Sequence, residues 1–190
     1  MKMRLAILLA LSTFAAVFAA GPEDACIAAL RHALGSSAKW TMERRLEGSV
    51  RPLVSSGTVD CFAQSGIVWR VERPFPSFIE MTADSMAFED EDGRREKPLK
   101  DMPHYAAIRE RTDAFAAGDV HAFDGLFSLE PRLAPDGRSW TLVMMPEVRG
   151  MRRLFTAIEL SGSETLTNAV LRTGDGGVSS IRFEETPRAR

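Results

Sequence analysis

Residues 55–93 read SSGTVDCFAQSGIVWRVERPFPSFIEMTADSMAFEDEDG, and this stretch carries the strongest indication of the fold. It consists of short runs rich in β-branched and aromatic residues, separated by residues that favour turns. The turn candidates are Gly57, Gly66, the corner at 73–76 and the pair Asp92-Gly93. The stretch therefore predicts three or four consecutive β-strands joined by tight connections.

The run IVWRVE at residues 67–72 indicates how these strands are oriented. Ile67, Trp69 and Val71 alternate with more polar neighbours. Because successive side chains of a strand point to opposite faces of a sheet, one face is expected to be apolar and the other mostly solvated. An antiparallel sheet of this kind must cover its apolar face with a second sheet, a helix or a ligand. The function depends on which of the three covers it.

The N-terminus predicts export. A basic start at residues 1–4 precedes an apolar run at 5–18 and small residues at Ala19 and Ala20, which is the pattern of a secretory signal peptide. The alternative is a retained membrane anchor, but roughly 14 apolar residues are few for a spanning helix. We therefore expect residues 1–19 to be a signal peptide.

The charge of the mature chain excludes some partners. Without Lys2 and Arg4 the chain has 22 basic and 26 acidic residues, a net charge of −4. This balance gives no electrostatic reason to bind nucleic acid or an anionic lipid surface. About 170 residues suffice for one domain with a core. We expect a single domain at residues 20–186, followed by a flexible tail at 187–190.

The first part of the chain predicts a helix and a strand. Residues 23–34 have an amphipathic pattern, with acidic residues in the first turn and Gly35 after the end. Residues 39–50 alternate and predict a long, half-buried strand, in which Arg44 interrupts the apolar set.

The second half predicts helices and then strands. Residues 94–98 are polar and predict a connection. Residues 103–118 have a helical period that ends at Gly118, and Asp119 is expected to cap a second short helix that reaches Phe123. Five further strands are predicted at 126–129, 140–145, 153–160, 169–172 and 178–184, with turns rich in Gly, Pro and Asp between them.

Meandering strands in this number usually curl into a barrel or a strongly curved sheet. We therefore expect a mainly β fold of the α+β class, a curved antiparallel barrel of about ten or eleven strands. The helical segments are too small to form a domain, so they are expected to cover the mouth of the barrel on its concave side.

A series of motifs adds a resemblance that covers nearly the whole mature chain. The first half contributes an Ala-rich first helix, Ser56-Gly57-Thr58, and Trp69 followed by Arg73-Pro74. The second half contributes Ala117-Gly118-Asp119, Ala122-Phe123, Leu126-Phe127, Trp140-Thr141-Leu142, Leu154-Phe155, Ile158-Glu159-Leu160, Asp175-Gly176-Gly177 and Ile181-Arg182-Phe183. In their order and spacing these motifs resemble the periplasmic carriers of outer-membrane lipoproteins, the LolA-like family.

The resemblance implies a half-open barrel in the periplasm whose hollow holds acyl chains in transit from the inner to the outer membrane. It also implies an inner-membrane exporter and an outer-membrane acceptor as partners, transient membrane contact, and a monomer. One departure concerns the family's Lys/Arg-Pro corner, whose arginine latches the helical lid. Residues 61–64 read Cys-Phe-Ala-Gln at the matching place.

The residues expected to line the hollow are the apolar members of the alternating strands, and nine methionines in the chain suit a surface that accepts variable apolar groups. They are Trp40, Met42, Leu46, Ile67, Trp69, Val71, Ile79, Met81, Phe88, Phe127, Leu129, Trp140, Leu142, Met144, Leu154 and Ile158. The alternative is that they form an ordinary packed core.

No enzyme chemistry is indicated. His32, His104 and His121 lack metal-ligand spacing, and the sequence has neither a GxSxG motif nor a phosphate-binding glycine loop. We therefore expect no catalytic residues, metal or cofactor. Cys26 and Cys61 predict a disulfide, because an exported chain is normally oxidised; a redox-active role is the weaker alternative.

Two other functions remain open. The protein could carry a free lipid, a glycolipid or an acylated pigment in place of a lipoprotein, which the departure at residues 61–64 favours. It could also be an interaction module of an envelope complex, with a filled core and a partner along a sheet edge. The second alternative predicts no uptake of apolar compounds.

Overall fold

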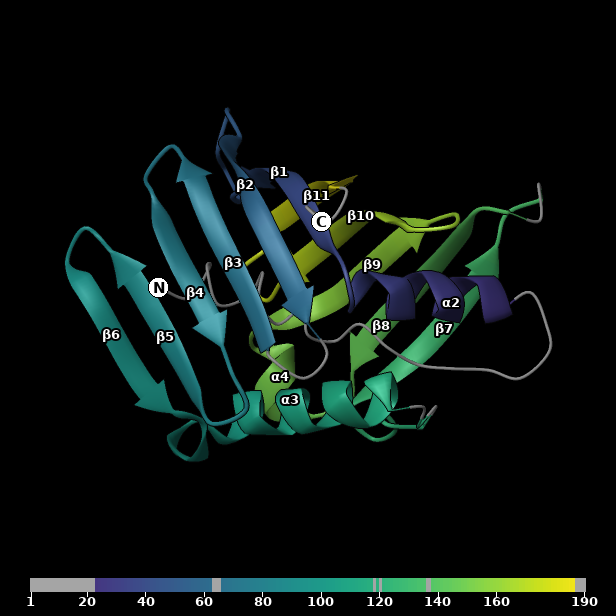
Figure 1. The fold of residues 1–190 in the computed structure, drawn as a ribbon. Helices are drawn as coiled ribbons and strands as arrows, with labels where there is room; N and C mark the ends of the chain where they lie inside the picture. Colours follow the sequence, from purple (N-terminus) through teal and green to yellow (C-terminus); the bar gives the residue numbers. More distant parts are fainter. Residues whose placement is uncertain (1–22, 63–65, 118, 120, 136–137, 187–190) are drawn as a thin grey trace.

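The fold is a single curved sheet that stays open. A computed structural model describes residues 23–62, 66–117, 119, 121–135 and 138–186. Within these residues eleven antiparallel strands form one sheet in the order β6-β5-β4-β3-β2-β1-β11-β10-β9-β8-β7 (Figure 1). Consecutive strands pair with each other, except β6 and β7, which form the two edges, and β1 also pairs with β11. Since β6 and β7 are not paired with each other, the sheet does not close, which confirms the predicted half-open, strongly curved architecture.

The elements have the following bounds. The strands are β1 (Ser37–Arg45), β2 (Leu53–Phe62), β3 (Gly66–Arg73), β4 (Ser77–Met81), β5 (Ser85–Asp90), β6 (Gly93–Pro98), β7 (Phe127–Leu133), β8 (Trp140–Pro146), β9 (Phe155–Gly162), β10 (Leu166–Thr173) and β11 (Val178–Thr186). The helices are α2 (Glu23–Ala33), the 3-10 turn η1 (Leu99–Asp101), α3 (Pro103–Ala116) and α4 (Arg149–Arg152). Among the described residues, no helix has the length and apolar character needed to cross a membrane.

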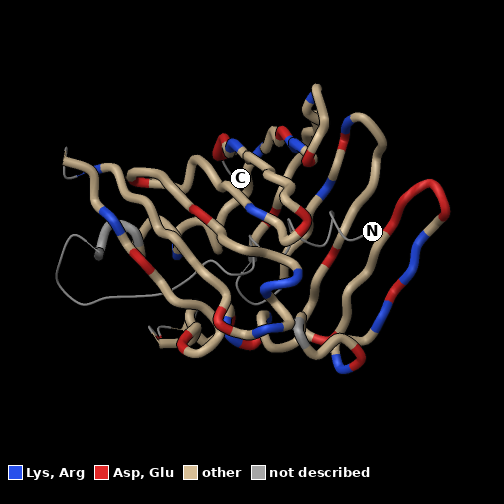
Figure 2. Tube along the Cα trace, turned by 180° about the vertical axis from the view of Figure 1, so that it is seen from behind, with Lys and Arg blue, Asp and Glu red and all other residues tan. Residues whose placement is uncertain are grey.

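Both edge strands differ from the prediction. Residues 94–98 were expected to be a connection, but they belong to β6, in which every residue is exposed. Figure 2 shows the alternation of charge along this edge. Charged side chains on an edge strand prevent pairing with other chains, so a fully polar strand is stable only at this position. At the other edge, Pro131 lies inside β7, where the missing N–H leaves no gap in the ladder.

The helical insertion is partly as predicted. The insertion forms the helix α3, as predicted, and the N-terminal helix α2 also forms. Residues 121–126, however, make consecutive turns in place of the predicted second helix of the insertion. Asp119 still acts as a local cap, since its Oδ1 accepts a hydrogen bond from the His121 N–H at 2.9 Å. Gly125 has φ +72°, a conformation that no helix contains. The expected cap at Gly118 lies outside the described residues.

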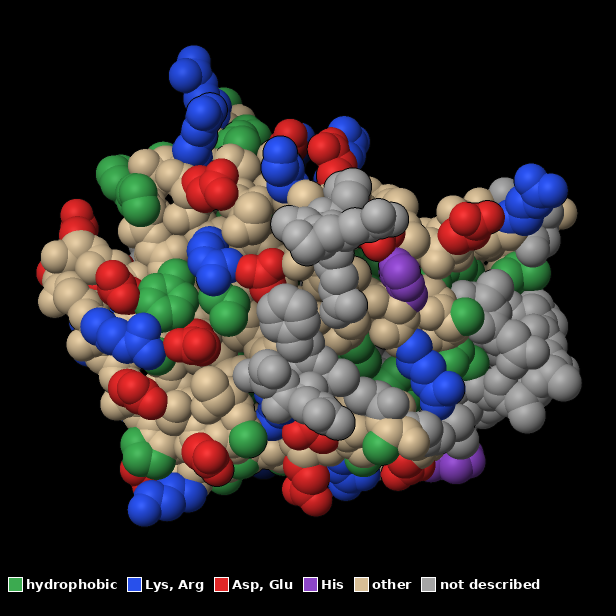
Figure 3. All heavy atoms as spheres, in the orientation of Figure 1, with side chains coloured by type: hydrophobic (Ala, Val, Ile, Leu, Met, Phe, Trp, Pro, Cys, Tyr) green, Lys and Arg blue, Asp and Glu red, His purple; other side chains and the backbone are tan. Residues whose placement is uncertain are grey.

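The outward surface of the first strands is polar. Figure 3 shows basic and acidic side chains alternating there around small hydrophobic patches. Arg94 lies 3.2 Å from Glu80 and 5.2 Å over the ring of Phe78, and Arg70 is paired with Asp60. Exposed pairs of this kind contribute little to stability, about 0–1 kcal/mol each. The apolar set of these strands therefore points to the other face of the sheet.

Gly57 is not the break that the sequence suggested. It lies inside β2, opposite Trp40 of β1 and Val71 of β3. A Cβ built on Gly57 would lie 1.9 Å from the Arg70 carbonyl oxygen and 3.0 Å from Cζ2 of Trp40. The missing side chain leaves room for the Trp40 ring, which stacks on Trp69 with centroids 4.5 Å apart.

We expect Gly57→Ala to lower the free energy of unfolding by about 1–3 kcal/mol, because an added methyl group in a filled space forces the backbone or the Trp40 ring to move. Urea denaturation followed by tryptophan fluorescence measures the change. Gly35→Ala is the matched control, since its nearest atom would be 3.7 Å away. Equal stability of both variants would contradict the packing described for Gly57.

Candidate functional site: the concave face

The concave face of the sheet gathers the residues that the sequence singled out. Eleven of them are buried: Trp40, Met42, Ile67, Trp69, Ile79, Met81, Phe127, Trp140, Leu142, Met144 and Ile158. Four pack against this cluster while partly exposed: Val71, Phe88, Leu129 and Leu154. Leu46 is the exception, because it follows the end of β1 and is 40 % exposed.

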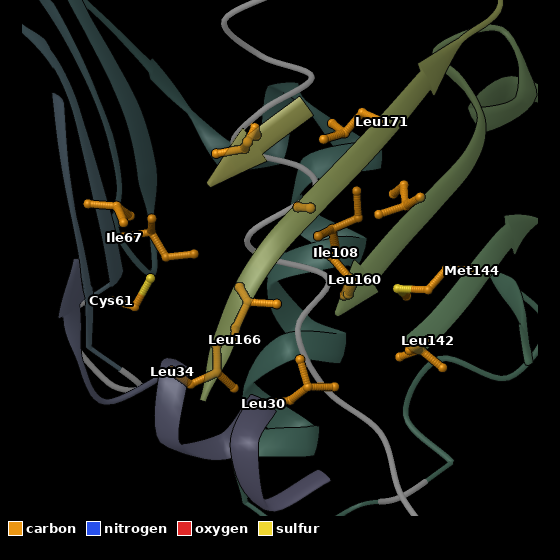
Figure 4. Packing of buried hydrophobic residues seen from close by; sticks show 14 of the residues in the cluster. Leu30, Leu34, Cys61, Ile67, Ile108, Leu142, Met144, Leu160, Leu166 and Leu171 are labelled. Atoms are coloured by element: carbon orange, nitrogen blue, oxygen red, sulfur yellow. The ribbon is translucent and has the colours of Figure 1, made fainter. Parts of the chain in front are cut away.

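The buried side chains come from both ends of the strand order. Figure 4 shows Cys61 and Ile67 on one side of the interior, and Leu142 and Met144 on the other. Ile108 of α3 lies between these two groups, and Leu30 of α2 lies below Ile108 in this view. The sheet therefore curves so far that strands distant in the order enclose one apolar space.

The tryptophans are held differently. Nε1 of Trp140 donates to the Ser163 carbonyl at 2.7 Å, so this ring is fixed to the turn that follows β9. Nε1 of Trp40 and Nε1 of Trp69 are both buried and have no hydrogen-bond partner among the described residues. A buried N–H without an acceptor is destabilising by about 1–3 kcal/mol. The two stacked rings thus present N–H donors at the concave face for which no described residue is an acceptor.

The helices cover this face to different degrees. α2 lies against β7, β8 and β10, and α4 lies against β8 and β9. The nearest neighbour of α3 is instead η1, and α3 reaches the core through single side chains such as Ile108 and Phe115, which are 1 % and 0 % exposed. In Figure 1, α3 runs along the lower end of the sheet. α3 is therefore the helix least tied to the sheet backbone.

The buried polar side chains of α3 are satisfied locally. Nε of Arg109 donates to Oδ2 of Asp113 at 2.8 Å, and the Thr112 hydroxyl donates to the Ile108 carbonyl at 2.9 Å. Arg111 donates to the carbonyl of Ala122, in the turns that follow the helix. Among the described residues, no side-chain hydrogen bond joins α3 to a strand. The helix and its following turns form a unit that is attached to the sheet by apolar contact.

Three polar side chains are buried on the inward face of the first strands. Arg44 of β1 is only 9 % exposed; it lies directly opposite Ser179 of β11 and Leu53 of β2, with Ser55 of β2 on the diagonal. Ser77 of β4 points inward opposite Val71. Arg44 Nε, Ser55 Oγ and Ser77 Oγ are buried without a hydrogen-bond partner in the described part of the chain. The sequence indicated Arg44 only as an interruption, and nothing in it indicated the serines.

Cys61 is a free thiol buried among apolar residues of β2 and its neighbours. Burial, and to a lesser extent the neighbouring Asp60 carboxylate, raise the pKa of this thiol to about 12. The predicted disulfide with Cys26 is not seen. Cys61 lies beside the end of α2, where its N–H bonds to the Ser36 carbonyl, whereas Cys26 is in the first turn of that helix. Cys26 and Ala33 are about 10 Å apart along the helix axis, so the two cysteines lie at different ends of α2.

We expect Cys61 to resist alkylation in the folded protein. With a pKa of about 12 against an ordinary 9.0, the thiolate is about a thousandfold scarcer than usual. Iodoacetamide treatment at pH 8, followed by peptide mass spectrometry, measures labelling at Cys61. Labelling should become rapid in concentrated urea, and equally rapid labelling without urea would contradict the burial.

A groove of about 1090 Å³ lies elsewhere, along β3, β4 and β5. It includes the apolar side chains of Val68 and Phe78, but also Arg70, Glu80 and Glu89. Val71 is its one residue that the sequence had predicted to bind acyl chains. Because charged groups make up much of its lining, it is less suited to an apolar ligand than the concave face. Among the described residues, no group of His, Cys, Asp and Glu is arranged to hold a metal.

The geometry defines a class of fold: an open, curved antiparallel sheet with short helices across its concave side. No protein-family model matches the sequence, and no curated protein matches it.

Solved structures that are similar to this chain include a LolA superfamily protein from Nitrosomonas europaea, with a TM-score of 0.39 and 9 % identity over 82 % of this chain and 86 % of that one. LprF from Mycobacterium bovis has a TM-score of 0.36 and 12 % identity, over 84 % and 90 % of the two chains. A DUF1329 family protein from Desulfovibrio piger has a TM-score of 0.39 and 11 % identity, over 86 % and 90 %.

Proposed function

We propose that the protein is a periplasmic carrier that holds the acyl chains of a lipoprotein or lipid against its concave face. The observation that carries the proposal is that aromatic, Leu, Ile and Met side chains from both halves of an open sheet converge in one buried cluster. Each methylene that an acyl chain buries there contributes about 0.8 kcal/mol. In this proposal the protein receives its cargo at the inner membrane and delivers it to an outer-membrane acceptor.

The attachment of α3 supports an exchange mechanism. In the absence of cargo, Ile108 and Phe115 of α3 occupy the apolar space, and cargo displaces them. α3 loses no described hydrogen bond to the sheet when it leaves, because its polar side chains are satisfied within the helix and its following turns. Apolar burial by the helix is thus replaced by apolar burial of the cargo. Release remains possible because only the difference between the two contributes to affinity.

Co-purified lipid is the direct test. The mature protein is purified from the periplasm and examined by native mass spectrometry, and any bound compound is extracted with organic solvent and identified. We expect a species with one or more acyl chains. A delipidated sample should also bind the apolar dye N-phenyl-1-naphthylamine. A ligand-free mass together with no dye uptake would overturn the proposal and favour an interaction module with a filled core.

The same experiment distinguishes the two kinds of cargo. A bound lipopeptide indicates lipoprotein transport, whereas a free lipid, glycolipid or acylated pigment indicates the narrower role. Both outcomes support an acyl-chain carrier, and they differ only in what the chains are attached to.

A further inference from the structure

Exposed apolar side chains concentrate at the tip of the hairpin that joins β1 to β2. Among the described residues seven large hydrophobic side chains are exposed, and four of them lie within residues 45–54, the hairpin tip. They are Leu46, Val50, Leu53 and Val54, with exposed fractions of 40 %, 98 %, 53 % and 54 %. Single exposed hydrophobic residues are ordinary, but a group of them on one hairpin marks an interaction site.

The hairpin tip projects from the sheet. β11 begins opposite Arg45 of β1, so residues 46–52 lie beyond the paired part of these two strands. On the other side β3 ends opposite Ser56, so Leu53 and Val54 of β2 pair with β1 but have no described strand next to them on that side. In Figure 1 the β1–β2 connection lies at the upper end of the sheet, away from α3.

The projecting turn has a defined shape. The N–H of Ser49 donates to the Leu46 carbonyl at 3.0 Å, and the Ser49 hydroxyl donates to the Arg51 carbonyl at 2.8 Å. Gly48 between them has φ +75°, and a Cβ built on it would have no atom within 4 Å. The turn is therefore held by its own hydrogen bonds and does not rest on any other described part of the chain.

Arginines flank the apolar residues of the hairpin tip. Arg45 and Arg51 are both exposed, and Glu47 is the one acidic residue in this segment. The Glu47 carboxylate lies over the β10–β11 turn, where its Oε2 is 2.6 Å from the position of a Cβ on Gly176. Figure 3 shows basic and hydrophobic side chains next to one another at the top of the molecule, over the β1–β2 connection. The hairpin tip is thus weakly basic, whereas the mature chain as a whole is acidic.

The directions of the apolar side chains favour a fluid partner. Leu53 and Val54 are consecutive residues of β2, so they point to opposite faces of the hairpin, yet both are about half exposed. A protein partner would need a pocket on each face, whereas lipid chains surround a projecting tip from all sides. Guanidinium groups at the base of such a tip fit the phosphate layer of a bilayer, where they form charge-assisted hydrogen bonds.

We propose that the hairpin tip docks the protein on the surface of an anionic membrane. Leu46, Val50, Leu53 and Val54 enter the outer part of the acyl layer, and Arg45 and Arg51 contact lipid phosphates. The inference goes beyond the proposed function, because it concerns where the protein meets a bilayer and not what the concave face holds. Four apolar side chains on one turn give a peripheral and reversible contact, as single weak anchors do.

Vesicle flotation tests the proposal. The mature protein is mixed with vesicles of phosphatidylethanolamine and phosphatidylglycerol, and the bound fraction is measured after centrifugation. We expect Val50→Ser combined with Leu53→Ser to weaken binding about tenfold or more, because two apolar side chains no longer leave water. Met145→Ser is the matched control and should change binding by less than about twofold. Met145 is also exposed, but it lies on β8, which β11, β10 and β9 separate from β1.

The arginines are tested separately. Arg45→Gln combined with Arg51→Gln should weaken binding to these vesicles about tenfold or more, since each basic residue near an anionic surface contributes about fivefold. Binding to vesicles of phosphatidylcholine alone should change by less than about twofold. Arg94→Gln combined with Arg95→Gln is the matched control, because it removes the same charge from β6 at the edge of the sheet. A similar loss in both double variants would contradict a contact at the hairpin tip.

Dye uptake separates this proposal from the carrier. The hairpin variants should take up N-phenyl-1-naphthylamine as the wild type does. If the wild type does not bind vesicles, or if Val50→Ser with Leu53→Ser binds them as the wild type does, membrane docking by the hairpin tip is wrong and a protein partner becomes the alternative. Neither result affects the carrier, which fails only if the wild type takes up no dye and holds no lipid. Val50→Ser alone, at a fully exposed position, keeps the test decisive if circular dichroism shows that the double variant does not fold.

Discussion

Leu142→Glu should abolish uptake of apolar dye while the protein stays folded. Leu142 is 2 % exposed and projects from β8 into the apolar space, opposite Leu160 of β9. A carboxylate there would remain solvated only if the helices that cover β8, α2 and α4, move aside, and it would then lie where acyl chains are proposed to bind. Burial of an unpaired charge in a dry core is instead strongly unfavourable. Dye titration measures uptake, and circular dichroism measures folding.

The control for this variant is the neighbouring residue. Thr141→Glu places the same charge on the outward face of β8, opposite Arg132 of β7, and should leave both uptake and folding unchanged. Normal uptake by Leu142→Glu would exclude the concave face as the binding site. Complete unfolding of Leu142→Glu would indicate that this face is an ordinary packed core. In that case we expect Trp69→Glu, on β3 in the other half of the sheet, to unfold as well.

Phe115→Ala should raise the affinity for apolar ligands by about tenfold or more, although it destabilises the protein. Phe115 is fully buried, 6.5 Å from the Phe123 ring, with the Arg31 guanidinium 5.2 Å over its face. Truncation of a buried Phe removes about 3–5 kcal/mol of packing. If α3 and the ligand compete for one space, the lost packing weakens the closed state, in which α3 fills that space. A larger fraction of the protein then has α3 displaced, and the apparent affinity for the ligand rises with this fraction.

A phenylalanine of the sheet provides the comparison. Phe155 of β9 is equally buried, so Phe155→Ala should lower the thermal midpoint by a similar amount but should not raise dye affinity. Differential scanning calorimetry and dye titration on the same samples measure both quantities. A lower dye affinity of Phe115→Ala would mean that α3 forms part of the binding surface, and the exchange mechanism would be wrong.

The alternation of residues in the strands was sufficient to predict most of the fold. Ile67 and Trp69 point inward as their period of two requires, and the same period placed Trp140, Leu142 and Met144. The inward direction of Val59, Ile181 and Phe183 follows from the same pattern, although these residues were not predicted to belong to the site. Strand direction is a local property of the backbone, so it can be inferred from neighbouring residues alone.

The errors occurred where a residue's role depends on a distant partner. Gly57 suggests a break, but its missing side chain is needed because Trp40 of the neighbouring strand fills the space. Residues 94–98 suggest a loop, but they form an edge strand, which only the strand order reveals. Cys26 and Cys61 suggest a disulfide, but α2 keeps their backbones apart. None of these relations is contained in a window of sequence.

The sequence by itself determined that the chain forms a long meander of half-apolar strands interrupted by helices, because hydrophobic period and turn residues act locally. The tertiary structure decided that the sheet remains open between β6 and β7, and that no side-chain hydrogen bond among the described residues joins α3 to a strand. It also buried Arg44 opposite Ser179 of β11, with Ser55 of β2 on the diagonal. These features depend on strand pairing and curvature, which join residues far apart in the chain.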